Sequence, residues 1–508
     1  MGESGFEPNQ PDSTGCDKSL SSGVASATDR GHNDNLSDAV LLVRSQVTFS
    51  NGRSGACEIL GELTLCGSLR FSLPSLFEFT MSGSFATAVP SAIAGSAGLM
   101  SPLSDSAKSG LRGELASRLT RGDQAQPNYV SDVVATVLAG AGEARASDIH
   151  FTPGETELTI LWRIDGVLQP VATLPRKLAA NVAARLKVLA DLLTYRTDIP
   201  QEGRLREGSP DAEMRLSTFP TLYGEKAVVR LFAGTGRYQW PSDLGLPDDI
   251  QRGLLGLLRE TAGALLITGP AGSGKTTTAY ACLRELHRES GAGKSLVTLE
   301  DPIETVLSGV SQSQVNRSAE FNYATGLRSL LRQDPDAILV GEIRDRETAE
   351  TVFQACLTGH LVLSTFHAGS AAEAVSRLGD MGIEPYLLRT GLLGIMCQRL
   401  FRARCECAVW TDDETAKLGF DVPRVRVPVG CAACDETGYR GRMLLAELLD
   451  PNAKDVGRAI LARSDATELH ALAERAGMQS MNQRAAQAVA AGSLSPIEAR
   501  RVLGFRGT

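Results

Sequence analysis

Short apolar stretches alternate with helical patterns in the second half of the chain. The apolar stretches lie at 263–268, 296–299, 337–341 and 361–365, and segments with helical apolar spacing separate them. Strands and helices that alternate in this way are typical of a mostly parallel sheet with helices on both faces. The pattern therefore predicts an α/β core over residues 251–396.

A different pattern precedes this core. Residues 127–236 contain a helical segment, alternating strand patterns and a basic helix over 177–193, followed by further strands. Such a mixture predicts an α+β domain. Residues 237–250, with Pro241 and Pro247, are typical of a linker.

The remaining segments have their own compositions. Residues 1–126 are rich in Ser, Gly, Ala and Asp, so we expect a poorly ordered, variable region with a small β-rich unit at 39–81. Residues 397–442 carry four clustered cysteines. Residues 443–508 are rich in Ala, and we expect a helical C-terminal subdomain there.

Composition narrows the class of protein. The 508 residues, 43% of them hydrophobic, are enough for about three domains. The formal net charge of -8 disfavours a nucleic-acid motor, which more often carries a basic face. The N-terminus is acidic and lacks a secretion signal, so the ten cysteines indicate a reducing compartment. Residues 79–104 are uncharged, but Gly, Ser and Ala make them a linker rather than a membrane span.

The first apolar strand of the core leads into a glycine-rich turn. Gly269, Gly274, Lys275 and Thr276 match the G-x-x-x-x-G-K-[ST] pattern, whose backbone N–H groups surround a polyphosphate. We expect Lys275 to reach the β- and γ-phosphates of ATP, and Thr276 to hold Mg2+. The alternative is a chance glycine-rich turn. The predicted ATP-binding residues of the loop are Gly269, Pro270, Ala271, Gly272, Ser273, Gly274, Lys275, Thr276 and Thr277.

Two other predicted strands end in carboxylates. The strand at 337–341 runs into Glu342, where P-loop ATPases place an acid that contacts the metal shell or polarises the attacking water. The alternative for Glu342 is a helix-capping role. The strand at 296–299 runs into Glu300, Asp301 and Glu304, whose mutual repulsion favours a nearby cation. A solvated acidic turn is the alternative for this acidic box.

Histidines and arginines supply further candidates. His360 and His367 flank the predicted strand at 361–365, and a histidine there can bond a γ-phosphate or transfer a proton. A satisfied core histidine is the alternative. Arginines can stabilise charge on a transferred phosphoryl group, although each alone could be a surface ion pair. The candidate arginines are Arg204, Arg215, Arg328, Arg332 and Arg344.

The cysteine cluster is typical of a metal site. Cys405 and Cys407 form a C-x-C pair, and Cys431 and Cys434 form a C-x-x-C pair. Four thiolates would suit tetrahedral Zn2+. Because the first pair is one residue shorter than usual, four free thiols remain the alternative.

Together these motifs resemble the ATPases of type II secretion and type IV pilus assembly over residues 127–508. The P-loop, the acidic box, the run at 330–336, the segment at 341–345 and the two histidines follow the family's order. The segments 146–150, 163–166 and 220–226 resemble motifs of the family's preceding domain. Residues 1–126 do not resemble the family's usual docking domain.

The resemblance implies a hexameric ATPase on the cytoplasmic face of the inner membrane. It implies a P-loop (RecA-like) core, with ATP between the two domains and movement driven by hydrolysis. An inner-membrane platform protein and a cytoplasmic-face adapter would be its partners, and membrane association would be peripheral. It also implies that Arg204 and Arg215 reach the nucleotide from the N-terminal domain, and that Arg328, Arg332 and Arg344 belong to the core.

We therefore expect Lys275, Glu342, Glu300 and His367 to be the catalytic residues of a secretion or assembly motor. A pilus retraction ATPase is one alternative. A nucleic-acid transport motor is another, although only 5% of the residues are aromatic and we expect no nucleic-acid partner. A silent nucleotide switch is a third, and intact Lys275 and Glu342 argue against it.

Overall fold

The computed structural model describes residues 45–48, 54–57, 111–121, 126–205, 213–232 and 238–505. The chain divides into a unit over 1–98 and a second unit over 99–508. In the first unit, β1 (Ser45–Thr48) and β2 (Ser54–Cys57) form an antiparallel pair. Both strands lie in the segment 39–81, where we expected a small β-rich unit, and the other residues of that segment lie outside the described residues.

The second unit begins with an α+β domain built on a six-stranded antiparallel sheet. The strand order is β5-β4-β3-β8-β7-β6. Its strands are β3 (Asp148–Pro153), β4 (Glu157–Ile164), β5 (Val167–Pro175), β6 (Gln201–Leu205), β7 (Glu213–Thr221) and β8 (Gly224–Phe232). Its helices are α1 (Leu111–Arg121), α2 (Tyr129–Glu143) and α3 (Ala179–Leu189), the last preceded by a short 3-10 turn, η2 (Arg176–Leu178).

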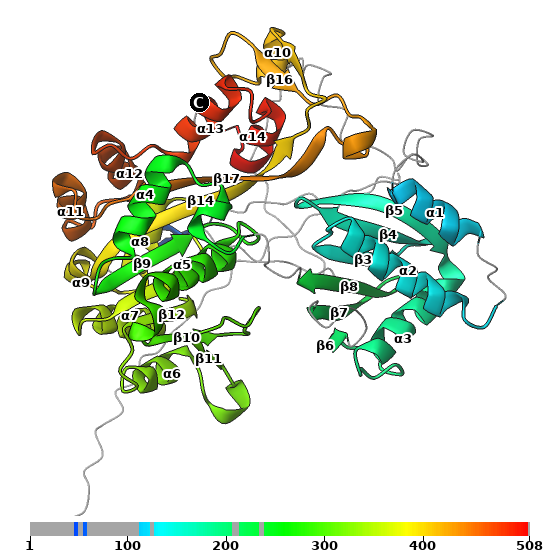
Figure 1. The fold of residues 1–508 in the computed structure, drawn as a ribbon, viewed down its shortest axis with the longest axis horizontal. Coiled ribbons are helices and arrows are strands. Elements are labelled where there is room, and N and C mark those ends of the chain that lie inside the picture. The colour runs from blue at the N-terminus through cyan, green and yellow to red at the C-terminus, as the bar shows by residue number, and fades with distance from the viewer. Residues whose placement is uncertain are drawn as a thin grey trace, which may run out of the picture. The chain divides into compact units, whose positions relative to one another are not determined.

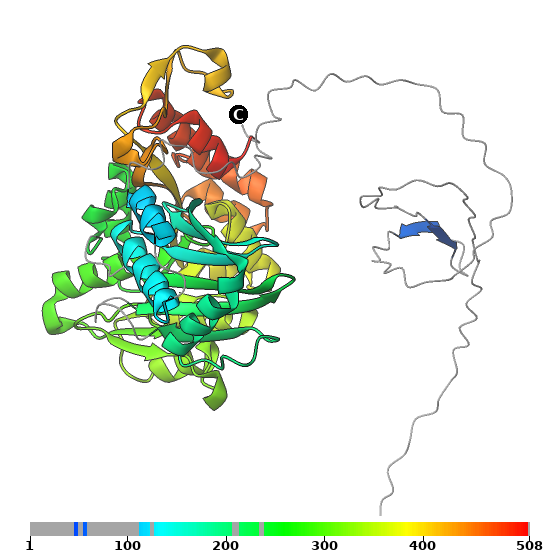
Figure 2. The same ribbon diagram turned by 90° about the vertical axis from the view of Figure 1, so that its right-hand side faces the viewer.

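One face of this sheet is covered by the helices. Ile149 and Phe151 alternate with the polar side chain of His150 along β3, and both pack in one apolar cluster with residues of α1, α2 and α3. Helices α1 and α2 lie side by side, as Figure 2 shows. The domain is the α+β arrangement that the alternating patterns predicted.

A seven-stranded sheet forms the next domain. Its order is β11-β10-β12-β13-β9-β14-β17, and every neighbouring pair is parallel except β14 with β17. Its strands are β9 (Gly263–Thr268), β10 (Leu296–Glu300), β11 (Ser311–Gln314), β12 (Ala337–Glu342), β13 (Leu361–Phe366), β14 (Leu392–Arg404) and β17 (Tyr439–Leu449). The mostly parallel sheet predicted for the core is confirmed.

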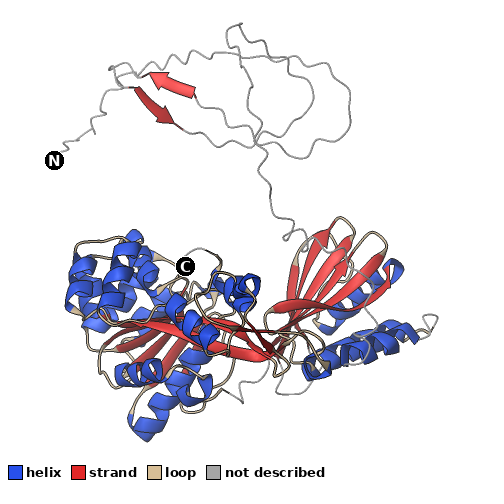
Figure 3. Ribbon diagram, turned by 90° about the horizontal axis from the view of Figure 1, so that it is seen from above, coloured by secondary structure: helices blue, strands red, loops and turns tan. Residues whose placement is uncertain are grey.

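Helices cover both faces of this sheet (Figures 1 and 3). Along β9, Ala264 and Leu266 join one apolar cluster, whereas Leu265 and Ile267 join another, which contains Leu283 of the P-loop helix. The helices are α4 (Asp248–Leu257), α5 (Lys275–Ser290), α6 (Tyr323–Leu330), α7 (Arg346–Leu357), α8 (Ala371–Asp380) and α9 (Pro385–Gly391), with 3-10 turns η3 (Pro241–Leu244), η4 (Gly291–Gly293) and η5 (Arg317–Ala319).

Two long strands connect this core to the rest of the chain. Strand β14 continues past residue 396, and β17 begins before residue 443, so both cross domain boundaries that we expected from the sequence. Between them lie β15 (Val409–Thr411), α10 (Glu414–Lys417), β16 (Val425–Val427) and η6 (Ala432–Cys434). The C-terminal helices are α11 (Lys454–Leu461), α12 (Ala466–Arg475), α13 (Met481–Ala490) and α14 (Pro496–Leu503).

None of the described helices combines the length and the apolar character needed to cross a bilayer.

Candidate nucleotide-binding site

The phosphate loop joins the carboxyl end of β9 to the start of α5. Strand β9 is buried along its whole length, and α5 begins at Lys275 directly after Gly274, whose φ of 88° is left-handed. Gly269 has a φ of 142°, and a Cβ there would lie 2.4 Å from the carbonyl oxygen of Gln398. The loop therefore requires glycine at both ends for backbone conformation, and at Gly269 also for space.

Lys275 lies across its own loop. Its Nζ atom donates hydrogen bonds to the carbonyl oxygens of Gly269 (2.9 Å) and Pro270 (3.0 Å). Burial lowers the pKa of Lys275, and the charge of Glu342 raises it in part. The ammonium group is thus held at the loop, where an anionic phosphate would be its natural partner.

The predicted acid lies at the same edge of the sheet. Strand β12 pairs with β13, which pairs with β9, so the carboxyl ends of these three strands meet beside the phosphate loop. Glu342 ends β12. Its Oε1 atom is paired with Arg344, and its Oε2 atom lies 3.6 Å from Nε2 of His367, the residue that follows β13. The fold therefore brings Lys275, Glu342 and His367 together.

His367 is held in place by its surroundings. Arg377 of α8 donates a hydrogen bond to its backbone carbonyl. The pKa of His367 is lowered, first by burial and then by the charges of Lys275, Arg344 and Arg377, while Glu342 opposes the shift. The imidazole is therefore neutral at physiological pH, and Nε2 can share a proton with the Glu342 carboxylate.

The acidic box divides into residues with different contacts. Glu300 is almost fully buried at the end of β10. Its carboxylate accepts hydrogen bonds from Tyr280 of α5, from Thr298 (2.6 Å) and from Gln312 (3.1 Å). Such a carboxylate is committed to neighbouring side chains, so its contacts favour a supporting position for Glu300.

The other acids of the box lie nearer the loop and its partners. The side chain of Glu304 interacts with that of Thr276, the residue predicted to hold Mg2+; burial raises the pKa of the Glu304 carboxyl, and the interaction with Thr276 opposes that shift. The backbone N–H of Glu304 also donates to the Tyr280 hydroxyl (3.2 Å). Asp301 lies within electrostatic reach of Arg344. Glu304 is thus the acid of the box that touches the predicted metal ligand.

His360 does not join this site. It precedes β13, whereas His367 follows it, and six strand residues separate the two along the sheet by about 20 Å. Its Nδ1 atom contacts the Thr358 hydroxyl and the Ala355 carbonyl, both 3.1 Å away. The expectation that His360 binds ATP is corrected on this geometry, because the amino ends of the parallel strands lie at the edge opposite the phosphate loop.

The candidate arginines occupy two domains. In the core, Arg328 pairs with Glu347, Arg344 pairs with Glu342, and Arg332 is exposed just beyond α6. In the α+β domain, Arg204 and Arg215 are direct partners across β6 and β7, so they share one face of that sheet.

Three contacts of the site were missed from the sequence. Gln398 of β14 contacts the phosphate loop, Tyr280 contacts the acidic box, and Arg377 contacts the His367 backbone. For Gln398 the one signal available was its place directly after the apolar run at 392–397, since a buried amide must have hydrogen-bond partners.

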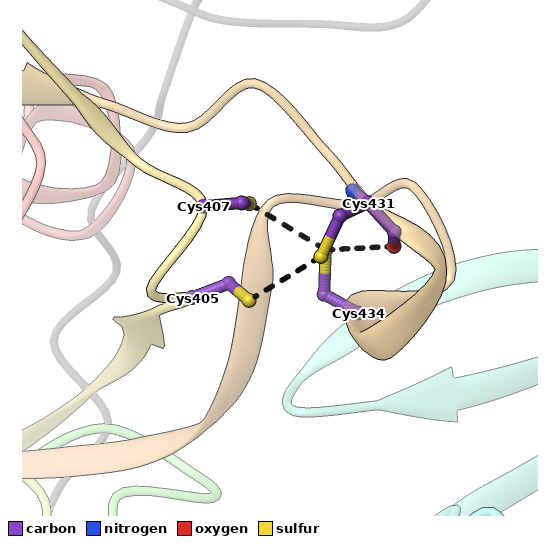
Figure 4. Close-up of side chains that lie close together, drawn as sticks. All are labelled: Cys405, Cys407, Cys431 and Cys434. Atoms are coloured by element: carbon purple, nitrogen blue, oxygen red, sulfur yellow. Dashed lines mark hydrogen bonds between the residues drawn. The ribbon is translucent and has the colours of Figure 1, made fainter.

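The four cysteines converge from two segments, as Figure 4 shows. Cys405 follows β14 directly and Cys407 lies in the turn after it, whereas Cys431 precedes η6 and Cys434 is the last residue of η6. Their sulfur atoms all lie within 4.8 Å of one another, with separations of 3.8 Å for Cys405–Cys431, 3.9 Å for Cys407–Cys434 and 3.7 Å for Cys431–Cys434.

These separations fit a tetrahedral metal. Four thiolates bound to Zn2+ at about 2.3 Å would lie about 3.8 Å apart. The Cys434 sulfur also accepts backbone N–H groups from Cys431 (3.2 Å) and Gly438 (3.1 Å), which fix its position in the cluster. The turn at 406–407 thus compensates for the shortened C-x-C spacing.

Comparison with known proteins places these features in a family. Residues 123–501 match the family described as type II/IV secretion system protein. The chain belongs to this family. It is similar to the type II secretion system protein E of Dickeya dadantii, with 44% identity over 324 residues, covering 62% of this chain and 64% of that protein.

Two further relatives extend the comparison. The type IV pilus assembly ATPase PilB of Thermus thermophilus is 38% identical over 381 residues, covering 73% of this chain and 42% of PilB. The matched region is therefore less than two thirds of the length of PilB and of the Dickeya dadantii protein. The solved ATPase DotB of Legionella pneumophila has a TM-score of 0.55 and 22% identity, covering 76% of this chain and 98% of that one. This last likeness shows the fold, and it confirms the predicted fold class.

Proposed function

We propose that this member of the family is an ATP-hydrolysing motor that drives assembly of a secretion pseudopilus or a type IV pilus. The observation that carries the proposal is the meeting of Lys275, Glu342 and His367 at one sheet edge, where the phosphate loop opens. This edge combines a phosphate-binding cation with a carboxylate that can activate water.

Each residue has a distinct task in this proposal. Lys275 exchanges its two carbonyl partners for the β- and γ-phosphates, and the loop N–H groups bind the remaining oxygens. Glu342 orients the attacking water and accepts its proton, and neutral His367 shares hydrogen bonding with that carboxylate. Thr276 and Glu304 would hold Mg2+, which supplies charge neutralisation on the phosphates.

Glu300 acts through its neighbours rather than on the nucleotide. Its buried carboxylate joins β10, α5 and β11 through Thr298, Tyr280 and Gln312. Tyr280 in turn binds the backbone of Glu304. This chain of contacts fixes the acid that touches Thr276.

The motor is proposed to work as a homo-hexamer. Arg204 and Arg215 share a sheet face of the α+β domain, and the charge of Arg215 acts on Glu304 of the acidic box. A pair of guanidinium groups reaching the phosphates from a second domain would couple domain movement to nucleotide state. Arg328, Arg332 and Arg344 would act from the core.

The names of the relatives support the proposed kind of machine. The relatives are named for type II secretion and for pilus assembly, which supports assembly over retraction. We propose a cytoplasmic protein bound peripherally at the inner membrane through a platform protein and an adapter, with no nucleic-acid partner.

We also propose that the four cysteines hold one structural Zn2+. The ion would cross-link the loop after β14 to the segment around η6. Its four ligands leave no open position, so its chemistry would be structural.

The deciding experiment is ATP turnover by the full-length chain in Mg2+ buffer, with its mass in solution recorded in parallel. Glu342→Gln and Lys275→Ala should abolish turnover, and turnover should rise as hexamers form. Tight nucleotide binding without turnover in any assembly state would contradict the motor and favour a nucleotide switch.

A further inference from the structure

Strand β14 carries a buried glutamine beside the phosphate loop. β14 runs parallel to β9 with Cys397 opposite Thr268, so the next residue, Gln398, lies where β9 ends and the loop begins. Gln398 is fully buried. A buried amide is retained at this position only if its hydrogen bonds are made.

Both ends of the amide have partners in the phosphate-binding element. Nε2 of Gln398 donates to the carbonyl oxygen of Ser273 (2.8 Å), and Oε1 accepts from the hydroxyl of Thr278 (3.0 Å). The orientation of the amide is unambiguous, because a carbonyl oxygen can only accept and must face the NH2 group. One side chain therefore joins the loop backbone to the first turn of α5.

The backbone of Gln398 supports the other end of the same loop. A Cβ on Gly269 would lie 2.4 Å from the Gln398 carbonyl oxygen, and a Cβ on Gly274 would lie 3.4 Å from its Nε2. Gln398 therefore contacts the first and the last glycine of the motif, and it forms the floor on which the loop rests.

The bond to Ser273 has a consequence for the neighbouring N–H group. In a trans peptide, the C=O of one residue and the N–H of the next point in opposite directions. When Gln398 holds the Ser273 carbonyl toward the floor, the Gly274 N–H is directed away from the floor, toward the interior of the loop. That N–H is one of the groups available to bind phosphate.

We propose that Gln398 is a positioning residue of the phosphate loop, which orients the Ser273–Gly274 peptide so that the Gly274 N–H faces the bound phosphates. The hydrogen bond to Ser273 sets the direction of the peptide, and the hydrogen bond to Thr278 holds the amide in the required orientation. The proposal rests on the proposed nucleotide binding, but it does not depend on hydrolysis.

The two bonds are separable by substitution. Gln398→Glu keeps the shape and an acceptor for Thr278, but in its ionised form it cannot donate to Ser273. Gln398→Leu removes both bonds, and Thr278→Val removes only the bond to Oε1. Gln398→Asn keeps the amide on a side chain that is too short to reach both partners. It is the replacement variant for the binding test if the other Gln398 variants fold poorly.

The test is equilibrium binding of a fluorescent ADP analogue to the full-length chain with Mg2+, together with the melting temperature and the KM and kcat for ATP. A misdirected N–H loses a hydrogen bond to a charged phosphate, so Gln398→Glu, Gln398→Leu and Gln398→Asn should each weaken ADP binding about 10- to 100-fold. KM for ATP should rise with kcat little changed, because Glu342 and His367 are untouched. Thr278→Val should weaken binding less than about threefold.

Two results would overturn the proposal. One is unchanged ADP affinity in a folded Gln398 variant. The other is an equal loss of affinity in Thr278→Val at a matched melting temperature, because it would mean that general destabilisation, and not the Ser273 bond, weakens binding. Binding is the primary measurement, so a wild-type chain that binds ADP but does not turn over ATP would contradict the motor while leaving this inference testable.

Discussion

The Nε2 atom of His367 lies 3.6 Å from Oε2 of Glu342, while Arg344 is paired with the other carboxylate oxygen. Two strands that neighbour each other in the sheet therefore supply a carboxylate and a neutral imidazole to the same place. The positive charge of Lys275 interacts with the Glu342 carboxylate and lowers the pKa of His367. Glu342 is thus fixed between a permanent cation and a titratable ring, beside the phosphate loop.

We predict that Glu342→Gln separates binding from hydrolysis. The amide keeps the shape of the side chain but cannot accept a proton, so turnover should fall by about 10²- to 10⁴-fold. Nucleotide affinity should stay near that of the wild type. Steady-state turnover and ADP titration measure the two effects. Glu350→Gln, at an acid of α7 that pairs with Arg346, is the matched control and should retain full turnover. Equal turnover in both variants would remove Glu342 from the mechanism.

We predict that ATP turnover falls at acidic pH because His367 becomes protonated. Its pKa is lowered below the ordinary value of about 6.5, so the ring stays neutral through physiological pH and gains a proton only at lower pH. The protonated ring would pair with Glu342 and hold the carboxylate away from water. Turnover should therefore fall as pH drops below about 6.5, and His367→Gln should lack this limb while having lower turnover at pH 7.5.

The same shift has a consequence for stability. Because the unfolded chain binds this proton more tightly than the folded chain, His367 should disfavour folding as pH falls below its ordinary pKa. The melting temperature of the wild type should then decline more steeply with acidification than that of His367→Gln. Parallel slopes in the two proteins would contradict a lowered pKa at this residue.

Much of this site could be predicted because its signals are local in sequence. The apolar strand, the glycines and Lys275 are contiguous, and the acids follow their strands directly. The partners that hold these residues are not local: Gln398 lies 125 residues beyond Ser273, and Tyr280 lies 20 residues before Glu300. Local patterning contains no information about which distant strand will lie beside the loop.

His360 shows that residues close together in the sequence can be separated by the fold. A histidine at each end of one strand looked like a pair, but a strand separates its two ends. In a parallel sheet only the carboxyl edge faces the loop, so His367 reaches Glu342 and His360 contacts Thr358 and Ala355. The direction of the strand, and not proximity in sequence, decides which residue of such a pair can join the site.

We predict that the purified chain carries about one Zn2+ and that Cys434→Ser releases it. The Cys434 sulfur is close to two other sulfurs and accepts two N–H groups, so its loss should free the segment around η6 and lower the melting temperature. Elemental analysis and thermal unfolding measure both effects. Cys282→Ala, at a buried cysteine outside the cluster, should keep its zinc. If the wild-type protein contains no zinc after expression in zinc-replete medium, the zinc site is contradicted and the four cysteines are free thiols.

The last prediction concerns the support of the acidic box. The Tyr280 hydroxyl donates to Glu300 and accepts from the backbone N–H of Glu304 (3.2 Å). Tyr280→Phe keeps the packing of the ring but leaves a buried carboxylate short of one donor and removes the acceptor for that N–H. We expect a loss of about 1–3 kcal/mol in the free energy of unfolding.

Function should change with it, because Glu304 interacts with Thr276 and its backbone N–H is held by Tyr280. Mg2+-dependent turnover should therefore fall in Tyr280→Phe, and excess Mg2+ should recover part of it. Tyr386→Phe, at an exposed tyrosine of α9, controls for the loss of a hydroxyl and should match the wild type in both melting temperature and turnover. If Tyr280→Phe is destabilised but turns over ATP normally at every Mg2+ concentration, the contact supports the fold alone and Glu304 does not depend on it for function.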